Sequence, residues 1–449
     1  MLSQNAIDFD DILLYTYKIL MEKQSVARIY HRIYKHICVD EAQDLNKAQY
    51  FVIKAIAGDN ASILMVGDPN QSIYGFNGSS HVYMSNHFMN EYGANKYNLD
   101  ENFRSSKSVI DAAKIIEPTF EMRGVLPIVG EVAIQVFENE ADEADWVIDK
   151  IDSLLKDGHA DIEGTTCSLE MCAILARNRY VFGNLEERLK QKNMKYSLRV
   201  SASKYILSES LFFKLFDLGL KLIMNPQDIL HFEEMKKNVN LTVLEYASFD
   251  VLRTSDEFRD ALGEEGFKVL NLAWDNLAGA QQTLKFPEAL KVLLTYCSPK
   301  EGDADTDKNE LSLMYNDYLA WEERWKLYVK KTTVEERNLA HMMRTIALGV
   351  TNITNEEGLT LSTVHMSKGL EFEVVFIIGL CEGVFPDYRA LKNESQLAEE
   401  QHNMFVSITR SKRLCYLCYP KQRQMPWGDI WVQSPSRYIQ LISSHNNVR

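Results

Sequence analysis

Two short apolar runs that each end in acidic residues constrain the fold of this chain more than any other feature. Residues 37–44 read Ile-Cys-Val-Asp-Glu-Ala-Gln-Asp, and residues 62–68 read Ser-Ile-Leu-Met-Val-Gly-Asp. We expect both runs to be buried, neighbouring strands of a parallel sheet. Parallel strands end at one edge of their sheet, so Asp40, Glu41 and the following Gln71 should meet at that edge. Nucleotide-hydrolysing sheets present a Mg²⁺ carboxylate and a water-orienting base in this way.

The rest of the chain alternates strands and helices until about residue 225. Asp8 can cap an amphipathic helix that reaches about Lys23, with an apolar stripe at Ile12, Leu13, Tyr17, Ile19 and Leu20. The patterns predict strands at residues 132–137, 171–176, 359–364, 374–380 and 414–419, and helices at 48–57, 106–116, 140–155 and 185–191. From about Asn225 to Thr351 the segments are helix-rich and show no clear strands. This order predicts an α/β protein with an all-helical insertion.

Bulk composition indicates a soluble, cytoplasmic protein of several domains. The 449 residues carry a net charge of −14, and no stretch approaches the length of a membrane-spanning run. Seven irregularly spaced cysteines suit a reducing compartment. Cys415 and Cys418 lie three apart in a strand-like run and should point to opposite faces, so we expect buried thiols rather than a metal site.

Charge is unevenly distributed along the chain. Residues 401–449 contain seven Lys or Arg and one acid, Asp429. A basic end on an acidic protein suits a confined groove that binds a polyanion. A chance cluster of basic residues on a solvated face would give the same sequence pattern.

Six blocks occur in the order and approximate spacing of UvrD/Rep/PcrA-type superfamily 1 DNA helicases, which the chain resembles over nearly its whole length. The blocks are Asp8-Phe9-Asp10-Asp11-Ile12-Leu13, Val39 to Asp44, Val66 to Phe76, Leu99 to Ser105, Thr363 to Phe372, and Glu399 to Ser411. The resemblance implies two RecA-like parallel-sheet P-loop NTPase domains, the first of them truncated, with a helical insertion in the second. The expected divisions are residues 1–125, 126–225, 226–350 and 351–449, the second and fourth being halves of the second RecA-like domain.

The resemblance implies roles in ATP hydrolysis with Mg²⁺. Asp40 matches the residue that holds the metal, Glu41 the residue that polarises the attacking water, and Gln71 the γ-phosphate sensor. Arg104 and Arg410 match two arginines that contact the γ-phosphate, a role that suits the guanidinium fork. Either arginine alone could instead be a surface ion pair, and the acidic pair could be a simple loop.

Further matches concern the nucleoside and the DNA. Phe103 stands where a tyrosine is more usual and should stack on adenine. Glu371 matches the acceptor from the ribose hydroxyl, and Gly369, two residues before it, is also expected to bind the nucleotide. Tyr74 and Phe76 resemble aromatic residues that stack on bases of single-stranded DNA, although two aromatics in a turn could also be core. Thr363 and His365 match positions on the DNA track, and His365 would couple that track to the nucleotide through Gln71.

Three departures from the family pattern stand out. The Walker A loop, G-x-x-x-x-G-K-[ST], is absent, because none of the 21 glycines precedes Lys-Ser or Lys-Thr. Asn77 replaces a frequent arginine, and Gln401 and His402 stand where relatives often carry two arginines.

The sequence therefore predicts part of an ATP-dependent 3′–5′ helicase or translocase on single-stranded DNA or at a single-strand/duplex junction. Without a phosphate-binding loop this chain alone should be inactive, and an N-terminal segment or a partner subunit carrying Walker A would complete it. The alternative is a non-catalytic DNA-binding or interaction module on a degraded helicase scaffold. Retention of Asp40, Glu41, Gln71 and both arginines favours the motor.

Overall fold

The computed structural model describes most of the chain in two compact units. The described residues are 9–59, 61–75, 78–162, 164–199, 208, 210–241, 248–278, 284–297, 305–347, 358–424 and 429–445. One unit comprises residues 1–200, 355–423 and 432–449, and the other comprises residues 201–354 and 424–431. The second unit thus begins before residue 226, the expected start of the helical insertion.

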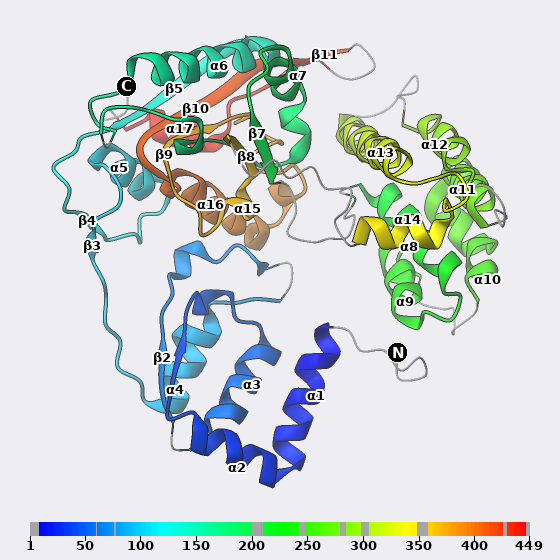
Figure 1. The fold of residues 1–449 in the computed structure, drawn as a ribbon, viewed down its shortest axis with the longest axis horizontal. Coiled ribbons are helices and arrows are strands. Elements are labelled where there is room, and N and C mark those ends of the chain that lie inside the picture. The colour runs from blue at the N-terminus through cyan, green and yellow to red at the C-terminus, as the bar shows by residue number, and fades with distance from the viewer. Residues whose placement is uncertain are drawn as a thin grey trace. The chain divides into compact units, whose positions relative to one another are not determined.

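A seven-stranded sheet forms the core of the first unit (Figure 1). Its strands follow the order β11-β10-β9-β6-β8-β7, and β5 pairs with β10; every pairing for which a register is known is parallel. The bounds are β5 Glu131–Asn139, β6 Cys172–Ala176, β7 Tyr196–Arg199, β8 Leu359–Thr363, β9 Phe372–Ile377, β10 Ser411–Gln424 and β11 Ile430–Val432. This arrangement confirms the expected α/β class.

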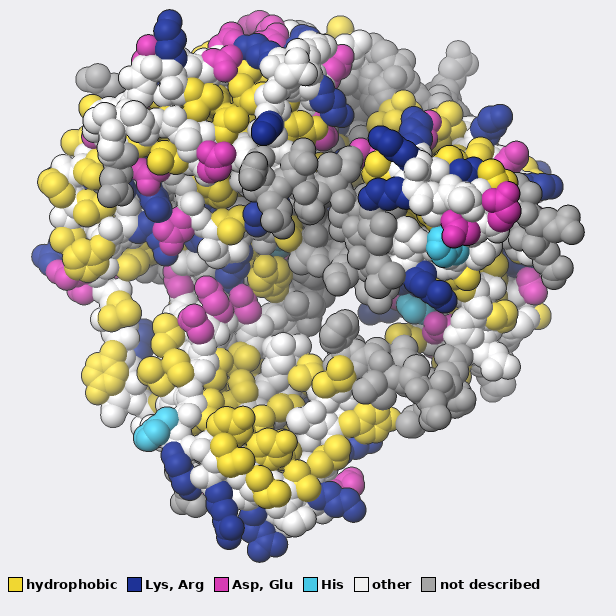
Figure 2. Space-filling view, in the orientation of Figure 1, with side chains coloured by type: hydrophobic (Ala, Val, Ile, Leu, Met, Phe, Trp, Pro, Cys, Tyr) yellow, Lys and Arg dark blue, Asp and Glu magenta, His cyan; other side chains and the backbone are white. Residues whose placement is uncertain are grey.

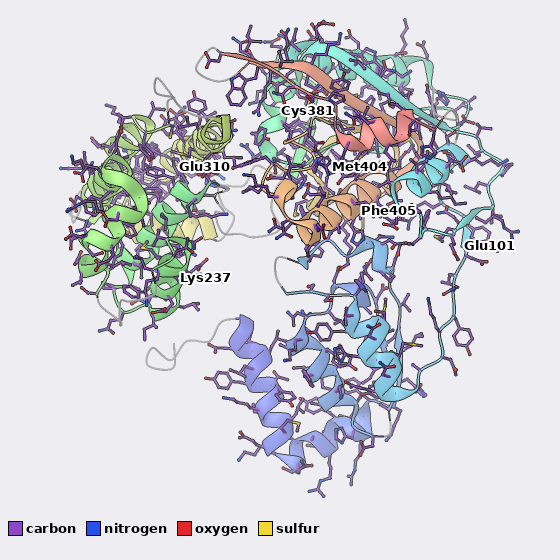
Figure 3. The ribbon with its side chains drawn as sticks, turned by 180° about the vertical axis from the view of Figure 1, so that it is seen from behind. Glu101, Lys237, Glu310, Cys381, Met404 and Phe405 are labelled. Atoms are coloured by element: carbon purple, nitrogen blue, oxygen red, sulfur yellow. The ribbon has the colours of Figure 1, made fainter. Side chains whose placement is uncertain are left out.

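Helices cover both faces of this sheet. One face packs on α5 (Lys107–Ile116), α15 (Val364–Ser367), α16 (Glu394–Thr409) and α17 (Arg437–Ser443), and the other on α6 (Glu140–Asp157) and α7 (Gly183–Gln191). Met404 and Phe405 of α16 are fully buried in the first of these layers (Figure 3). Cys415 joins one layer and Cys418 the other, both without exposed surface, which confirms that they are buried thiols on opposite faces.

The N-terminal part of the same unit contains a separate pair of parallel strands. These are β1 (His36–Val39) and β2 (Ser62–Met65), with the helices α1 Phe9–Glu22, α2 Gln24–Ile33, α3 Lys47–Ala57 and α4 Met89–Tyr92. A third, two-residue pair joins β3 (Glu101–Asn102) to β4 (Arg123–Gly124). No helix in the described part of the chain is long and apolar enough to cross a membrane.

The expectation that the first two strands are buried was wrong. Val39, Ile63 and Met65 pack on a small cluster around Tyr50, but Cys38 is exposed and Leu64 is 58% exposed. The pair therefore has one packed face and one open face. In α1, likewise, Leu20 is buried, whereas Ile12 and Ile19 of the expected apolar stripe are nearly half exposed.

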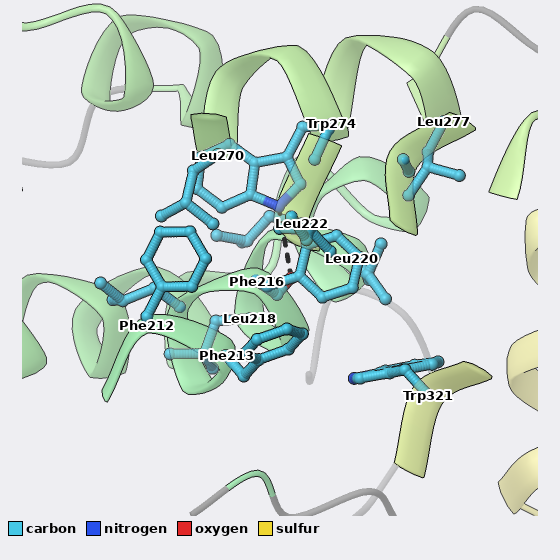
Figure 4. Close-up of a cluster of buried hydrophobic side chains, with 14 of the residues drawn as sticks. Phe212, Phe213, Phe216, Leu218, Leu220, Leu222, Leu270, Trp274, Leu277 and Trp321 are labelled. Carbon is cyan, nitrogen blue, oxygen red and sulfur yellow. Dashed lines mark hydrogen bonds between the residues drawn. The ribbon is translucent and has the colours of Figure 1, made fainter. Parts of the chain in front are cut away.

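Between residues 201 and 354, the regular structure that is described in the second unit is helical. Its helices are α8 Leu211–Met224, α9 Ile229–Asn238, α10 Phe249–Arg253, α11 Asp256–Ala278, α12 Phe286–Leu294, α13 Asp305–Lys331 and α14 Leu339–Ala347. Trp274 of α11 packs on α8 and donates a hydrogen bond from Nε1 to the carbonyl of Phe216 over 3.3 Å (Figure 4). Gly219 permits this approach, because a Cβ there would lie 2.2 Å from the indole.

Candidate nucleotide site

The acidic residues after β1 lie in a tight, strained turn. Glu41 adopts a left-handed backbone conformation with φ of 50°, which is uncommon for a residue other than glycine. Its backbone N–H donates to Oδ1 of Asp40 over 2.9 Å, and both carboxylates belong to exposed residues. The turn therefore presents two carboxylates at the carboxyl end of β1, as the sequence predicts.

Gln43 links this turn to the end of β2. Its side-chain amide donates to Oε2 of Glu41 over 2.5 Å, and its carbonyl oxygen accepts from the backbone N–H of Asp68 over 3.1 Å. Gln43 is almost fully buried. Sequence reasoning did not assign it a role, although it lies between Glu41 and Asp44 in the block that was singled out.

Gln71 joins the loop after β2 to Arg410 at the end of α16. Its Nε2 donates to Oδ2 of Asp68 over 3.0 Å, and its Oε1 accepts from Nη2 of Arg410 over 3.2 Å. One side chain thus contacts both the acidic loop and a distant cation. The predicted sensor and one predicted arginine are direct neighbours.

Arg410 is a buried guanidinium whose hydrogen bonds, within the described residues, all go to neutral oxygens. It is 2% exposed and donates to the carbonyls of Val406 and Leu370, to the hydroxyl of Thr409 and to Gln71. Burial lowers the pKa of Arg410 to about 10, and the positive charge of Arg104 adds to this effect. A buried cation held only by neutral groups is suited to an anionic ligand.

The second predicted arginine lies close to the first. Arg104 forms an ion pair with Glu371 at 2.6 Å, and its backbone carbonyl accepts from Arg413 over 2.6 Å. The neighbouring Phe103 is 65% exposed. The structure thus brings the expected adenine, ribose and phosphate residues of this region together around Arg104.

Lys368 contacts the acidic turn and was not assigned a role from the sequence. Its Nζ donates to Oδ2 of Asp44 and to the carbonyl of Gln71, each over 2.6 Å, and lies 3.9 Å from Oε2 of Glu41. Burial raises the pKa of Asp44 despite this lysine. Gly369 follows with φ of 81°, a conformation that favours glycine, which lets the chain turn directly after the lysine.

Three of the four residues that are expected to contact DNA lie in the described part of the chain, and all three are at least partly buried. Thr363 ends β8, and His365 follows in α15; burial lowers the pKa of His365 to about 3, and Arg177 adds to this effect, so the imidazole is neutral. Tyr74 is half-buried and donates from its hydroxyl to the carbonyl of His365 over 3.1 Å. Phe76 lies outside the described residues.

The two positions that lack the family's arginines make structural contacts. Gln401 donates to the carbonyl of Ile116 over 2.8 Å, and the ring of His402 lies 3.1 Å from the carbonyl of Ser72. These side chains therefore connect α16 to α5 and to the loop that contains Gln71.

The donor set around Asp40 and Glu41 fits a magnesium nucleotide better than a free metal. No group of three or more metal-ligating side chains occurs in the described parts of the chain. Mg²⁺ in phosphate-transferring sites is commonly held by one or two carboxylates together with the phosphates themselves. Asp40 offers an exposed carboxylate, and Arg410 is a buried cation that donates its hydrogen bonds, among the described residues, to neutral oxygens.

Comparison with known proteins yields one family. Residues 1–92 match the UvrD/REP helicase N-terminal domain, and residues 97–260 and 322–422 match the UvrD-like helicase C-terminal domain. The chain is 29% identical to ATP-dependent DNA helicase PcrA of Staphylococcus aureus strain Mu50 over 469 residues, which is 98% of this chain and 62% of the relative. The protein of the same name from Staphylococcus epidermidis strain ATCC 12228 is 29% identical over 476 residues, 99% of this chain and 64% of the relative. The chain thus spans less than two thirds of these relatives.

Proposed function

Because the chain belongs to the UvrD-like helicase family, we propose that it is part of an ATP-driven motor that moves 3′ to 5′ on single-stranded DNA. The observation that carries this proposal is Arg410, buried among neutral oxygens and hydrogen-bonded to Gln71. The carboxylates of Glu41, Asp68 and Glu371 act on its charge from a distance. Hydrolysis of a γ-phosphate requires a cation to stabilise the developing negative charge, together with polar groups that position the phosphate and the attacking water.

Each residue has a defined part in this proposal. Asp40 holds Mg²⁺, which supplies charge neutralisation on the phosphates. Glu41 orients and polarises the attacking water, and Gln71 donates to the γ-phosphate. Arg410 and Arg104 stabilise the charge that develops on the phosphate oxygens, Phe103 stacks on adenine, and Glu371 accepts from the ribose.

We propose that a further polypeptide segment, N-terminal to this sequence or on a partner subunit, supplies the phosphate-binding loop. The open face of β1 and β2 supports this, because parallel strands are normally covered on both faces. Hydrophobic side chains gather on the surface of this part of the molecule (Figure 2), and the exposed residues include Leu64 of β2 and Val66, which directly follows it. A segment that covered these residues would also complete the nucleotide site.

Single-stranded DNA is the proposed track, contacted by Tyr74, Phe76, Thr363 and His365. Base stacking on an aromatic ring contributes roughly 1–3 kcal/mol per base and needs no sequence preference. We expect Tyr74→Ala to weaken binding to a fluorescent oligothymidine about tenfold, measured by anisotropy at fixed salt. Tyr74→Phe, which keeps the ring and removes the hydroxyl that donates to the carbonyl of His365, should bind normally. Equal affinities of both variants and the parent would contradict the stacking role.

The alternative is a non-catalytic DNA-binding module. The absent glycine–lysine loop favours it, as do Gln401 and His402 in their structural contacts. Against it, a module without ATP hydrolysis has no need of a buried guanidinium facing Gln71.

ATP hydrolysis stimulated by single-stranded DNA separates the two functions. The full chain should hydrolyse ATP negligibly by itself and robustly when it is co-expressed with the polypeptide encoded immediately upstream. DNA binding without hydrolysis in both samples would favour the module, and robust hydrolysis by the pure chain would contradict the proposed need for a further segment.

A further inference from the structure

Two cysteines of the first unit lie in sulfur–sulfur contact. Sγ of Cys167 is 3.5 Å from Sγ of Cys172, the one such contact among the described residues. All seven cysteines are free thiols. The contact lies in the segment that leads into β6, and no step of the proposed ATP hydrolysis uses either residue.

The two thiols differ in solvent access and in secondary structure. Cys172 is fully buried as the first residue of β6, level with Val374 of the neighbouring β9. Cys167 is partly exposed and follows Thr165 and Thr166, which are exposed. Cys167 is therefore the sulfur that a small solute can reach, and Cys172 is held in place behind it.

The contact also differentiates their reactivity. The hydrogen bond from Cys172 lowers the pKa of Cys167, against the opposing effects of burial and of Glu373. The same contact, together with burial, raises the pKa of Cys172. Because the thiolate is the reactive form, Cys167 is the nucleophile of the pair and Cys172 the resolving thiol.

We propose that Cys167 and Cys172 form a peroxide-reactive dithiol site that closes to a reversible disulfide. The Cys167 thiol releases its proton, and the thiolate attacks one oxygen of a hydroperoxide, so that the O–O bond breaks. Cys167 becomes a sulfenic acid, and the other oxygen takes up the released proton and leaves as water or alcohol. Cys172 then attacks Sγ of Cys167, the S–O bond breaks, and the hydroxyl leaves as water with the thiol proton of Cys172. Two thiols thus supply the two electrons that reduce one peroxide, and a dithiol reductant restores them.

Closure requires little movement. A disulfide places its sulfurs about 2.05 Å apart, so the pair must approach by about 1.5 Å. The strand fixes Cys172, whereas Cys167 lies outside any helix or strand, between exposed threonines and the short helical turn Leu169–Met171. The movement therefore falls on the Cys167 side.

Peptide mapping of the full-length chain tests the inference directly. Cleavage after Lys156 and Arg177 releases both cysteines in one peptide. After brief exposure of the reduced protein to equimolar hydrogen peroxide and then to N-ethylmaleimide, we expect this peptide to lose two hydrogen atoms and to carry no maleimide. Dithiothreitol should restore two alkylated thiols.

Variants distinguish the roles of the two thiols. In Cys172→Ser, dimedone should trap a sulfenic acid at Cys167; in Cys167→Ser, Cys172 should remain reduced. Cys38→Ser removes an exposed thiol of β1 and should leave disulfide formation unchanged. The proposal is overturned if peroxide leaves both thiols alkylatable in the parent chain, or oxidises Cys167 to a sulfinic acid without forming the disulfide.

Discussion

Arg410 donates a hydrogen bond from Nη2 to Oε1 of Gln71 over 3.2 Å, and so joins residues that are 339 positions apart in the sequence. The same glutamine donates to Asp68, and its backbone carbonyl accepts from Lys368. Gln71 is therefore the point where the loop after β2, the segment after β8 and the end of α16 meet.

Arg410→Ala should abolish DNA-stimulated ATP hydrolysis in the completed motor. An arginine that stabilises transferring phosphate contributes roughly 10³–10⁵ in kcat, and we expect a loss in that range. Steady-state phosphate release measures it. Arg437→Ala, which removes an exposed arginine paired with Glu382, is the matched control and should keep full activity. Similar rates for both variants would exclude Arg410 from the reaction.

Lys368→Met should destabilise the first unit and disturb the acidic turn. Lys368 is 6% exposed and pairs with Asp44 at 2.6 Å, so its removal leaves a half-buried carboxylate without its cation. Losing one partner of such a pair costs about 3 kcal/mol. Urea denaturation measures the free energy of unfolding.

Lys412→Met is the control for that experiment, because Lys412 is 32% exposed and lies 3.7–3.8 Å from its carboxylates. Its loss should cost under about 1 kcal/mol. The double variant Asp44→Asn with Lys368→Met should recover part of the stability. An equal loss in the free energy of unfolding for the two lysine variants would show that the contact of Lys368 with Asp44 stabilises the fold no more than the contacts of Lys412 do.

Glu143 should make the first unit less stable as the pH rises. Burial raises the pKa of Glu143 to about 8, whereas its ordinary value is 4.5, so the folded state retains a proton that the unfolded state releases. This contribution to stability is complete below about pH 4.5, declines as the pH rises, and levels off above about 8.

Glu143→Gln should flatten that decline, since the amide can still accept from the N–H of Gly379 but does not ionise. Melting temperatures at pH 5, 6, 7 and 8 measure the effect. Asp145→Asn, on the exposed side of the same helix, should leave the slope unchanged. A slope that is the same in Glu143→Gln and in the parent would contradict the buried, protonated state.

The strands of the main sheet were predicted well from the sequence, because apolar runs bounded by turn residues are typical of buried strands and of little else. The alternation in β10 sends Cys415 and Cys418 into opposite layers, as period-two geometry requires. The positions of Gln71 and Arg410 within ordered blocks likewise led us to expect these two residues at one site, and the structure joins them by a hydrogen bond. Boundaries of the main elements agree within a few residues.

Contacts between side chains that are far apart in the sequence were harder to predict. Lys368 lies 324 residues from Asp44, and no local pattern reveals which of many lysines reaches that carboxylate. The open face of β1 and β2 was also missed, because Cys38 and Leu64 are apolar residues of the kind that usually lie in a core. Burial depends on what packs over a strand, and apolar character alone does not report it.

The most direct measurement is single-turnover hydrolysis of ATP by Glu41→Gln in the completed motor with single-stranded DNA present. If Glu41 polarises the attacking water, the rate of the chemical step should fall by roughly 10²–10⁴ while the affinity for ATP stays within about twofold of the parent. A variant that hydrolyses bound ATP at the parental rate would contradict the assignment of this turn as the site of hydrolysis.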